Sequence, residues 1–372
     1  MIGTGIVSAQ QSDEQVAAYY YDHGEYAQAA QLYEGLYKRG TNRYHYQRLL
    51  SSYLALEQYK DAMRLVERRQ KSHPQELSLL VDEGTVHHRQ RQEKKALRCY
   101  DKAVERVGSN QQPVADLAQA FLSAGRPDYA ARTYLAARAA TSNRTLYFTE
   151  MVTVYQQMGD YEAMTGEYFD LLDHQPGMMG SVQVSMQKML QEAPDKRLSD
   201  GVRRTLVSRV REHPDSKVYL EMMIWFSLQE NDFAFALEQA EAADARYPEG
   251  QGEQVMRVAQ IAQKNGALDV AADGYRYVQR KGQEGIHYFD ARVGELEVDF
   301  ARINHHYAVD PKSLVSLRGK YLSAFDELGR NLHTVDLMRH YAALMAYYAD
   351  DAQEAVSTLD DVLELPRLKP QV

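Results

Sequence analysis

The chain has 372 residues, of which 44% are hydrophobic and 26% charged, and its formal net charge is −9. With a mean hydropathy of −0.55, this composition excludes a multi-span membrane protein, and we expect no transmembrane span. The acidic balance argues against general nucleic-acid binding, which requires a stripe of basic side chains, so we expect no nucleic-acid partner.

The N-terminus is uncharged and largely apolar over residues 1–10. Val7-Ser8-Ala9 resembles the small-x-small end of a secretory signal peptide, although a basic n-region and a full apolar core are missing. We interpret residues 1–10 as a remnant signal peptide, or as a disordered tail. The first interpretation favours the bacterial periplasm or cell envelope, and the second leaves the cytoplasm as the alternative.

A residue pattern then recurs in steps of 33 or 34 residues over 11–176, which is typical of an array of helical hairpins. Small residues let two helices approach closely, and large flat side chains fill the space between successive hairpins. The two clearest rows are Ala29, Ala62, Ala96, Ala130, Met164 and Tyr33, Val66, Tyr100, Tyr134, Tyr168. Two further rows are Tyr20, Tyr53, His87, Phe121, Tyr155 and Ala17, Leu50, Gly84, Ala118, Val152.

The turns between paired helices include HGEY at 23–26, AGRP at 124–127 and MGDY at 158–161, where Gly ends the first helix. Together with the small-x-x-Tyr and Ala-x-x-x-Tyr/Phe spacings and the closing Pro176, these residues resemble the tetratricopeptide repeat (TPR) family over 13–176. The resemblance implies a right-handed α-solenoid, with five regular TPR repeats over 11–176. It also implies a concave groove, lined by the first helix of each hairpin, that binds partners.

The pattern weakens after QPGMMGS at 175–181, which breaks the register. We expect degenerate TPR-like repeats over 177–285, then longer irregular helices and a final hairpin over 286–372. One helix is predicted over 311–328, with Asp310 as N-cap, Pro311 at its first position and Gly329 after its end. No segment alternates with period two over the length of a strand, so the predicted fold class is all-α.

The final hairpin presents apolar side chains that no later repeat covers, namely Leu359, Val362, Leu363 and Leu365. Uncovered apolar faces of this kind tend to associate. We therefore expect that the native protein continues with more helices, or that another chain docks at the C-terminal end.

Motifs of enzymes are missing from the sequence, including phosphate-binding loops, nucleophile elbows, His-Glu-x-x-His and paired cysteines. His87 and His88 point about 100° apart on a helix, so the pair does not converge on a metal ion. Cys99 is expected to be a small buried apolar residue. Glu295, Glu297 and Asp299 alternate along one helix and are expected not to share a face. We predict no enzymatic activity, no cofactor and no metal site.

The resemblance to the TPR family places partner-binding residues at mid positions of the first helices. The Lys/Asn/Arg clamp that holds a peptide carboxylate is missing there, so the groove is predicted to be neutral and to fit an extended or helical segment. Tyr21, Tyr37, Tyr44 and Tyr46 lie outside the rows and are candidates for the surface. The predicted groove residues are Tyr21, Gln47, Ser51, Thr85, His88, Gln119, Thr149, Thr153 and Gln156.

The predicted function is that of a non-enzymatic scaffold that binds protein or peptide partners in a bacterial cell-envelope assembly. The alternative is an envelope solenoid that binds a glycan or assists nutrient uptake. Aromatic rings on the groove floor favour a sugar, whereas amides and aliphatic side chains favour a peptide.

Overall fold

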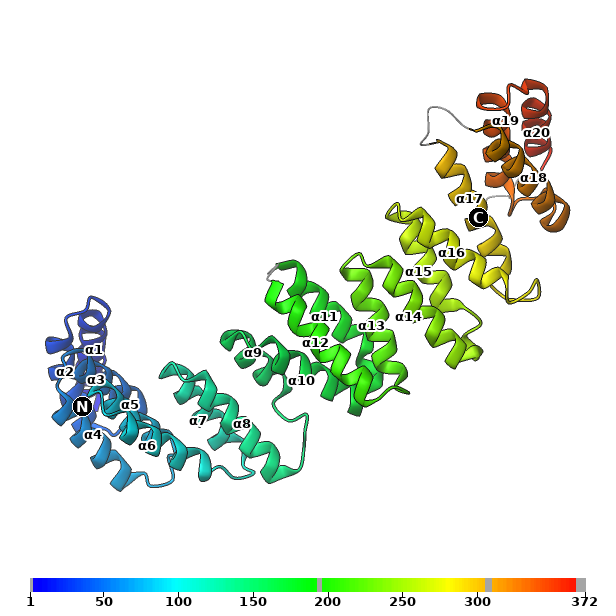
Figure 1. Ribbon diagram of the computed structural model, residues 1–372. Helices are drawn as coiled ribbons and strands as arrows, with labels where there is room; N and C mark the ends of the chain where they lie inside the picture. The colour runs from blue at the N-terminus through cyan, green and yellow to red at the C-terminus, as the bar shows by residue number, and fades with distance from the viewer. Residues whose placement is uncertain (1–2, 193–195, 305–309, 366–372) are drawn as a thin grey trace. The chain divides into compact units, whose positions relative to one another are not determined.

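The computed structural model describes residues 3–192, 196–304 and 310–365. Over these residues the chain consists of α-helices, two short 3-10 turns and connecting loops, with no strand (Figure 1). The protein is therefore an all-α solenoid of helical hairpins, as predicted. The chain divides into two compact units, Met1–Pro176 and Gly177–Val372.

The first unit contains five helical hairpins. Within each hairpin the two helices pack against each other, and α5 also packs on α7 while α6 packs on α8. We refer to the accessible surfaces of the first helices of these hairpins, which are the odd-numbered ones, together as the first-helix face. The helices are α1 (Gly3–Asp22), α2 (Tyr26–Arg39), α3 (Arg43–Ala55), α4 (Tyr59–Ser72), α5 (Ser78–Arg89), α6 (Glu93–Glu105), α7 (Gln111–Ser123), α8 (Pro127–Thr141), α9 (Phe148–Met158) and α10 (Tyr161–His174).

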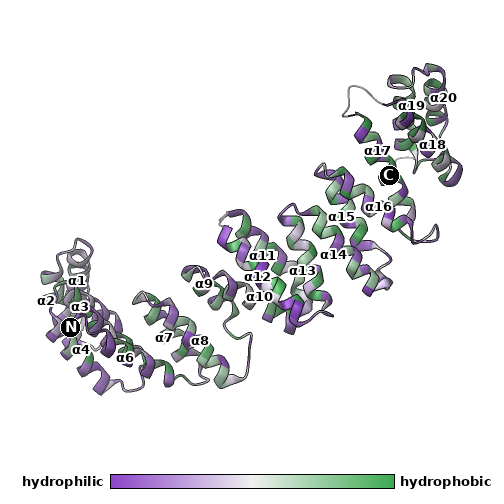
Figure 2. Ribbon diagram, viewed as in Figure 1, coloured by the Kyte–Doolittle hydropathy of each residue, from purple (hydrophilic) through white to green (hydrophobic). Residues whose placement is uncertain are grey.

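Three of the four predicted rows are buried in this unit, whereas the row that begins with Tyr20 is half-buried except at Phe121. All five residues of the small row and all five of the Tyr row are buried. Most individual helices carry both hydrophilic and hydrophobic residues, consistent with one buried and one exposed side (Figure 2). Gly84 shows how close the approach is, because a Cβ on it would lie 2.7 Å from Cδ1 of Tyr100. The row assignment is confirmed at these positions.

Each hairpin turn in the first unit passes through the left-handed backbone region. Gly24, Gly125 and Gly159 have φ of 76°, 70° and 69°, which glycine adopts without steric cost. Glu57 and Arg91 occupy the equivalent position in the second and third hairpins, with φ of 56° and 59°. The left-handed turn is therefore common to all five hairpins, including the two without glycine.

The second unit continues with hairpins and then longer helices. Its hairpin helices are α11 (Met179–Glu192), α12 (Lys196–Glu212), α13 (Lys217–Gln229), α14 (Phe233–Arg246), α15 (Glu253–Lys264) and α16 (Leu268–Gln279). They are followed by α17 (Tyr288–Asn304), α18 (Pro311–Leu328), α19 (Val335–Tyr347) and α20 (Ala352–Glu364). As predicted, Asp310 caps α18 by accepting a hydrogen bond from the Ser313 N–H at 3.1 Å, and Gly329 follows its end with φ of 78°.

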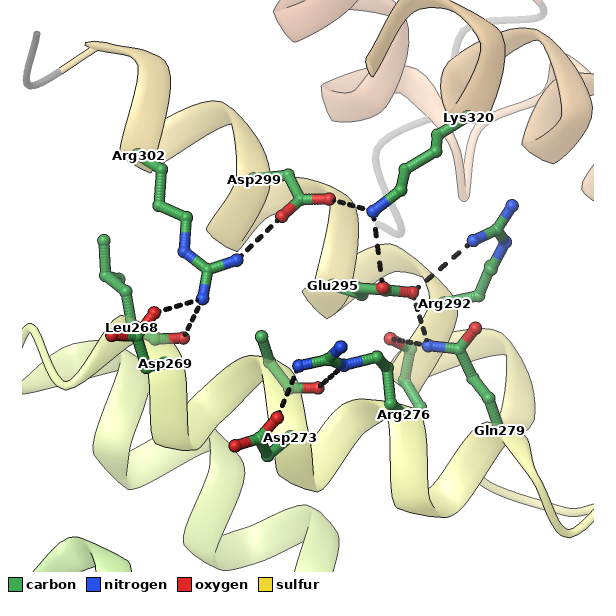
Figure 3. Close-up of polar contacts among 12 residues, drawn as sticks. Leu268, Asp269, Asp273, Arg276, Gln279, Arg292, Glu295, Asp299, Arg302 and Lys320 are labelled. Carbon is green, nitrogen blue, oxygen red and sulfur yellow. Dashed lines mark hydrogen bonds and ion pairs between the residues drawn. The ribbon is translucent and has the colours of Figure 1, made fainter. Parts of the chain in front are cut away.

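A network of ion pairs joins α16, α17 and α18 (Figure 3). Lys320 Nζ lies 3.6 Å from Glu295 Oε1 and 2.5 Å from Asp299 Oδ2. Arg302 Nη2 reaches Asp269 Oδ1 on α16 at 2.5 Å. Glu295 and Asp299 both contact Lys320 and share a face, against the expectation, because residues four apart lie one above the other on a helix. Glu297 instead accepts a hydrogen bond from Gln263 Nε2 on α15 at 3.0 Å.

Candidate functional site

The predicted groove residues all lie on the first helices of the first unit, on α1, α3, α5, α7 and α9. Three of them are half-buried, namely Tyr21, Ser51 and Thr85. Six are exposed, namely Gln47, His88, Gln119, Thr149, Thr153 and Gln156. Their side chains are therefore accessible, and their binding of a partner stays a prediction.

The hydroxyl groups on this face make local hydrogen bonds. Thr85 Oγ1 donates to the Val81 carbonyl at 2.8 Å, and Thr153 Oγ1 donates to the Thr149 carbonyl at 2.9 Å. A hydroxyl that donates once still has lone pairs with which to accept. The face therefore presents uncharged hydrogen-bonding groups that match the N–H groups of a peptide.

Arg48 on α3 forms a cluster with two tyrosines, and this cluster was not predicted from the sequence. Its guanidinium carbon lies 4.3 Å from the ring centroid of Tyr21 and 5.3 Å from that of Tyr44. These are cation–π distances. Arg48 Nη1 also lies 4.0 Å from Asp22 Oδ1, which compensates its charge. Arg48 was missed because it directly follows Gln47, about 100° around the helix from the predicted groove position.

The tyrosines at positions 37, 44 and 46, which lie outside the repeat rows, have different environments. Tyr44 is 37% exposed, as expected for a surface residue, whereas Tyr37 and Tyr46 are buried, so the surface expectation is wrong for those two. The Tyr46 hydroxyl donates to Asp82 Oδ2 on α5 at 2.8 Å. Burial of the Asp82 carboxyl raises its pKa to about 6. This pair was also missed, because its two residues are 36 apart and neither belongs to a motif.

A second polar contact crosses the first-helix face. Arg43 Nη1 on α3 lies 3.5 Å from Asp116 Oδ2 on α7, and Arg43 Nε lies 3.5 Å from Glu76 Oε1. The arginines of α3 are thus compensated by acids of neighbouring hairpins. Charged residues are therefore present near the predicted groove, and its neutrality stays a prediction.

Potential metal ligands come together once in the described part of the chain, where Glu83 and His87 of α5 meet Cys99 of α6. His88 points elsewhere, with its Nδ1 2.7 Å from Glu93 Oε2. The adjacent histidines therefore do not converge, as predicted. Cys99 is half-buried, and the expectation of an inert apolar residue overlooked its carboxylate and imidazole neighbours.

The C-terminal hairpin exposes part of its apolar surface. Leu359 is 44% exposed and Leu363 is 76% exposed, as expected. Val362 and Leu365 are half-buried and pack against the hydrophobic core formed by α17–α20, so the expectation that they are uncovered is wrong. Val356, one turn before Leu359 on α20, is 58% exposed and extends the exposed stripe.

Among the described residues, no helix combines the length and the hydrophobicity that a membrane span requires. No family description matches the sequence, and no curated protein matches it either.

Solved structures with helical repeats are similar to this chain. The yeast Tom70 structure is 11% identical over 97% of this chain and 93% of that one, with a TM-score of 0.30. The TPR domain of P58(IPK) is 11% identical over 96% of this chain and 94% of that one, with a TM-score of 0.26. The C-terminal part of a TPR repeat-containing protein from Cytophaga hutchinsonii is 14% identical over 74% of this chain and 98% of that one, with a TM-score of 0.28.

Proposed function

We propose that the protein is a non-enzymatic scaffold that binds a protein or peptide segment on the first-helix face of its first unit. The observation that carries this proposal is the row of accessible amides and hydroxyls, such as Gln47, Gln119 and Thr153, repeated on successive first helices. A repeated set of neutral groups suits an extended or helical segment that contacts several hairpins at once. We further propose a right-handed superhelix, in which this face is the concave one.

The test compares the two faces of the first unit by adding the same charge and bulk to each. Gln47→Arg and Gln119→Arg change exposed residues on the first-helix face, and Gln31→Arg changes an exposed residue on α2 as a matched control. Each full-length variant is used to capture proteins from the native envelope fraction, with quantification by mass spectrometry. We expect wild type and Gln31→Arg to capture the same set of partners. Gln47→Arg and Gln119→Arg should each fail to capture this set. Equal retention by all three variants would refute binding on this face.

We propose a bacterial cell-envelope location, in which residues 1–10 are the remnant of a signal peptide. Met1 and Ile2 lie outside the described residues, and Gly3–Gln10 form the start of α1. The support for this proposal is therefore the sequence of this segment. Cell fractionation of the native protein is the test, and recovery in the cytoplasmic fraction would contradict it.

Glycan binding is the second candidate, favoured by the Tyr21 and Tyr44 rings on the first-helix face. Aromatic rings bind sugars through their flat faces, and the Arg48 guanidinium lies over both of these rings. Displacing it would cost two cation–π contacts, which makes a peptide the better fit. Titration of envelope oligosaccharides into the protein, followed by Tyr fluorescence, distinguishes the two candidates, since a saturable change lost in Tyr44→Ala supports the glycan.

We also propose that the protein associates with itself through the exposed stripe of Val356, Leu359 and Leu363 on α20. These residues lie on consecutive turns of one helix and form a continuous apolar strip. Sedimentation velocity of wild type and Leu359→Lys/Leu363→Lys is the test. A wild-type protein that stays monomeric at high concentration would refute self-association.

A further inference from the structure

The third hairpin of the first unit differs from the others at two positions of its first helix. Glu83 stands where the other four hairpins have Val16, Leu49, Leu117 and Met151. His87 stands where the other four have Tyr20, Tyr53, Phe121 and Tyr155. An apolar side chain and an aromatic side chain are thus replaced by two groups that bind metal ions, four residues apart on the same helix.

The structure brings a third such group to the same place. The ligand atoms of Glu83, His87 and Cys99 all lie within 4.8 Å of one another, and all three side chains are half-buried. Ligands of a tetrahedral zinc ion lie about 3.3–3.8 Å apart, since Zn–N and Zn–S bonds are about 2.0–2.3 Å long. Side-chain adjustments of about 1 Å are therefore enough to close the three groups around one ion.

Two glutamines form hydrogen bonds to the side chains of His87 and Glu83. Gln92 Oε1 lies 3.2 Å from His87 Nδ1, and an amide oxygen can only accept, so Nδ1 carries the proton and Nε2 keeps a free lone pair. Gln70 Nε2 donates to Glu83 Oε2 at 2.9 Å, which leaves the other carboxylate oxygen for a ligand. Such outer partners fix the tautomer and the orientation of metal ligands.

We propose that Glu83, His87 and Cys99 form a zinc-binding site between α5 and α6, with the fourth position open to solvent or to an exogenous ligand. A thiolate and an imidazole favour zinc over magnesium or calcium, which prefer oxygen ligands alone. Three protein ligands with one open position are the arrangement of an accessible zinc site, in contrast to the four protein ligands of a closed structural site. On binding, the Cys99 sulfur forms a bond to zinc and its proton leaves to solvent.

The proposal is tested with tag-free, full-length protein freed of metal by chelation, titrated with ZnCl₂ against a chromophoric chelator. We expect one zinc ion per chain. Cys99→Ala and His87→Ala should each weaken binding by more than about 100-fold, because removal of an outer-shell partner alone costs about 10–100-fold. Gln92→Ala should fall within that smaller range. His174→Ala removes an exposed histidine of α10 and should leave zinc affinity unchanged.

Cobalt provides a readout that a change in folding does not imitate. Co²⁺ bound at this site should show a thiolate-to-cobalt charge-transfer band in wild type and in His174→Ala, and the band should be absent in Cys99→Ser. Circular dichroism without metal shows whether each variant is folded. The proposal is wrong if folded wild-type protein binds no stoichiometric zinc, or if Cys99→Ala and His87→Ala bind it as tightly as wild type.

Discussion

Arg138 and Glu167 form a buried, two-bonded ion pair between α8 and α10. Arg138 Nη1 donates to Glu167 Oε1 at 2.9 Å, and Nη2 donates to Oε2 at 2.6 Å. Only 8% of Arg138 and 7% of Glu167 is exposed. Arg138 Nε also donates to the Leu146 carbonyl at 2.6 Å, in the loop before α9. The pair therefore ties the fourth and fifth hairpins together with the loop that connects them.

Removal of one partner should strongly destabilise the first unit. In Glu167→Ala the Arg138 guanidinium stays buried without its counter-ion, and we expect the free energy of unfolding to fall by about 3–5 kcal/mol. The control is Glu34→Ala, which removes an exposed pair with Lys38 (2.8 Å) and should cost less than about 1 kcal/mol. Urea unfolding monitored by circular dichroism measures both. Similar losses for the two variants would show that Arg138 is rehydrated when its partner is removed.

The packing of the hairpins could be predicted from the sequence, because small residues and large rings recur with the period of the fold. Ala130 belongs to the small row and Tyr134 to the Tyr row, and both residues are buried. The Arg138–Glu167 pair could not be predicted in this way. Its partners are 29 residues apart, and their meeting depends on side-chain conformations and on the course of the loop at Leu146.

Gly84 should be intolerant of any side chain. A Cβ at this position would lie 2.7 Å from Cδ1 of Tyr100 and nearer still to Cε1 of the same ring, which is fully buried. We expect Gly84→Ala to lower the free energy of unfolding by about 1–3 kcal/mol through overpacking. Gly35→Ala is the control, because Gly35 lies within α2 and a Cβ there meets no atom within 4 Å. That change should stabilise by about 0.5–1 kcal/mol, since alanine favours helix.

Glycine should stabilise the two hairpin turns that lack it. Glu57 and Arg91 hold φ of 56° and 59°, a conformation that costs an L-residue roughly 1–2 kcal/mol. Since glycine also loses more entropy on folding, we expect a net gain of about 0.5–1 kcal/mol for Glu57→Gly and for Arg91→Gly. Glu105→Gly, at an exposed position near the end of α6, controls for charge loss and should not stabilise. The measurement is thermal unfolding. If the turn variants melt at the same temperature as wild type or lower, the left-handed conformation of Glu57 and Arg91 does not destabilise the protein.

The first-helix face could be predicted only in part. The resemblance to the TPR family placed Gln119 and Thr153 on the first helices, and both side chains are accessible there. It did not reveal that Arg48 lies over Tyr21, or that Asp82 pairs with Tyr46. These contacts join residues of different hairpins, and a row of equivalent positions contains no information about which long side chains meet.

Asp82 should make the stability of the protein depend on pH. Its carboxyl is buried, and this burial outweighs the Tyr46 hydrogen bond and raises the pKa to about 6, while Glu76 adds to the rise and Arg43 and Arg69 oppose it. In the unfolded chain the pKa of an Asp is about 3.9. Between pH 4 and 6 the folded state therefore binds more protons than the unfolded state, so this residue makes stability fall as the pH rises.

The variant Asp82→Asn isolates this contribution, because an amide keeps the oxygen that accepts from Tyr46 but has no charge to bury. We expect Asp82→Asn and wild type to be closest in stability near pH 4. Above pH 6 the variant should be more stable by on the order of 1–3 kcal/mol, which is the cost of ionising a buried carboxyl with this shift. In Tyr46→Phe the ionised carboxyl loses its hydrogen bond, so the pKa of Asp82 should rise further. The fall in stability should then extend to higher pH. A stability difference between Asp82→Asn and wild type that is constant from pH 4 to pH 7, measured by urea unfolding, would show that the Asp82 carboxyl titrates normally.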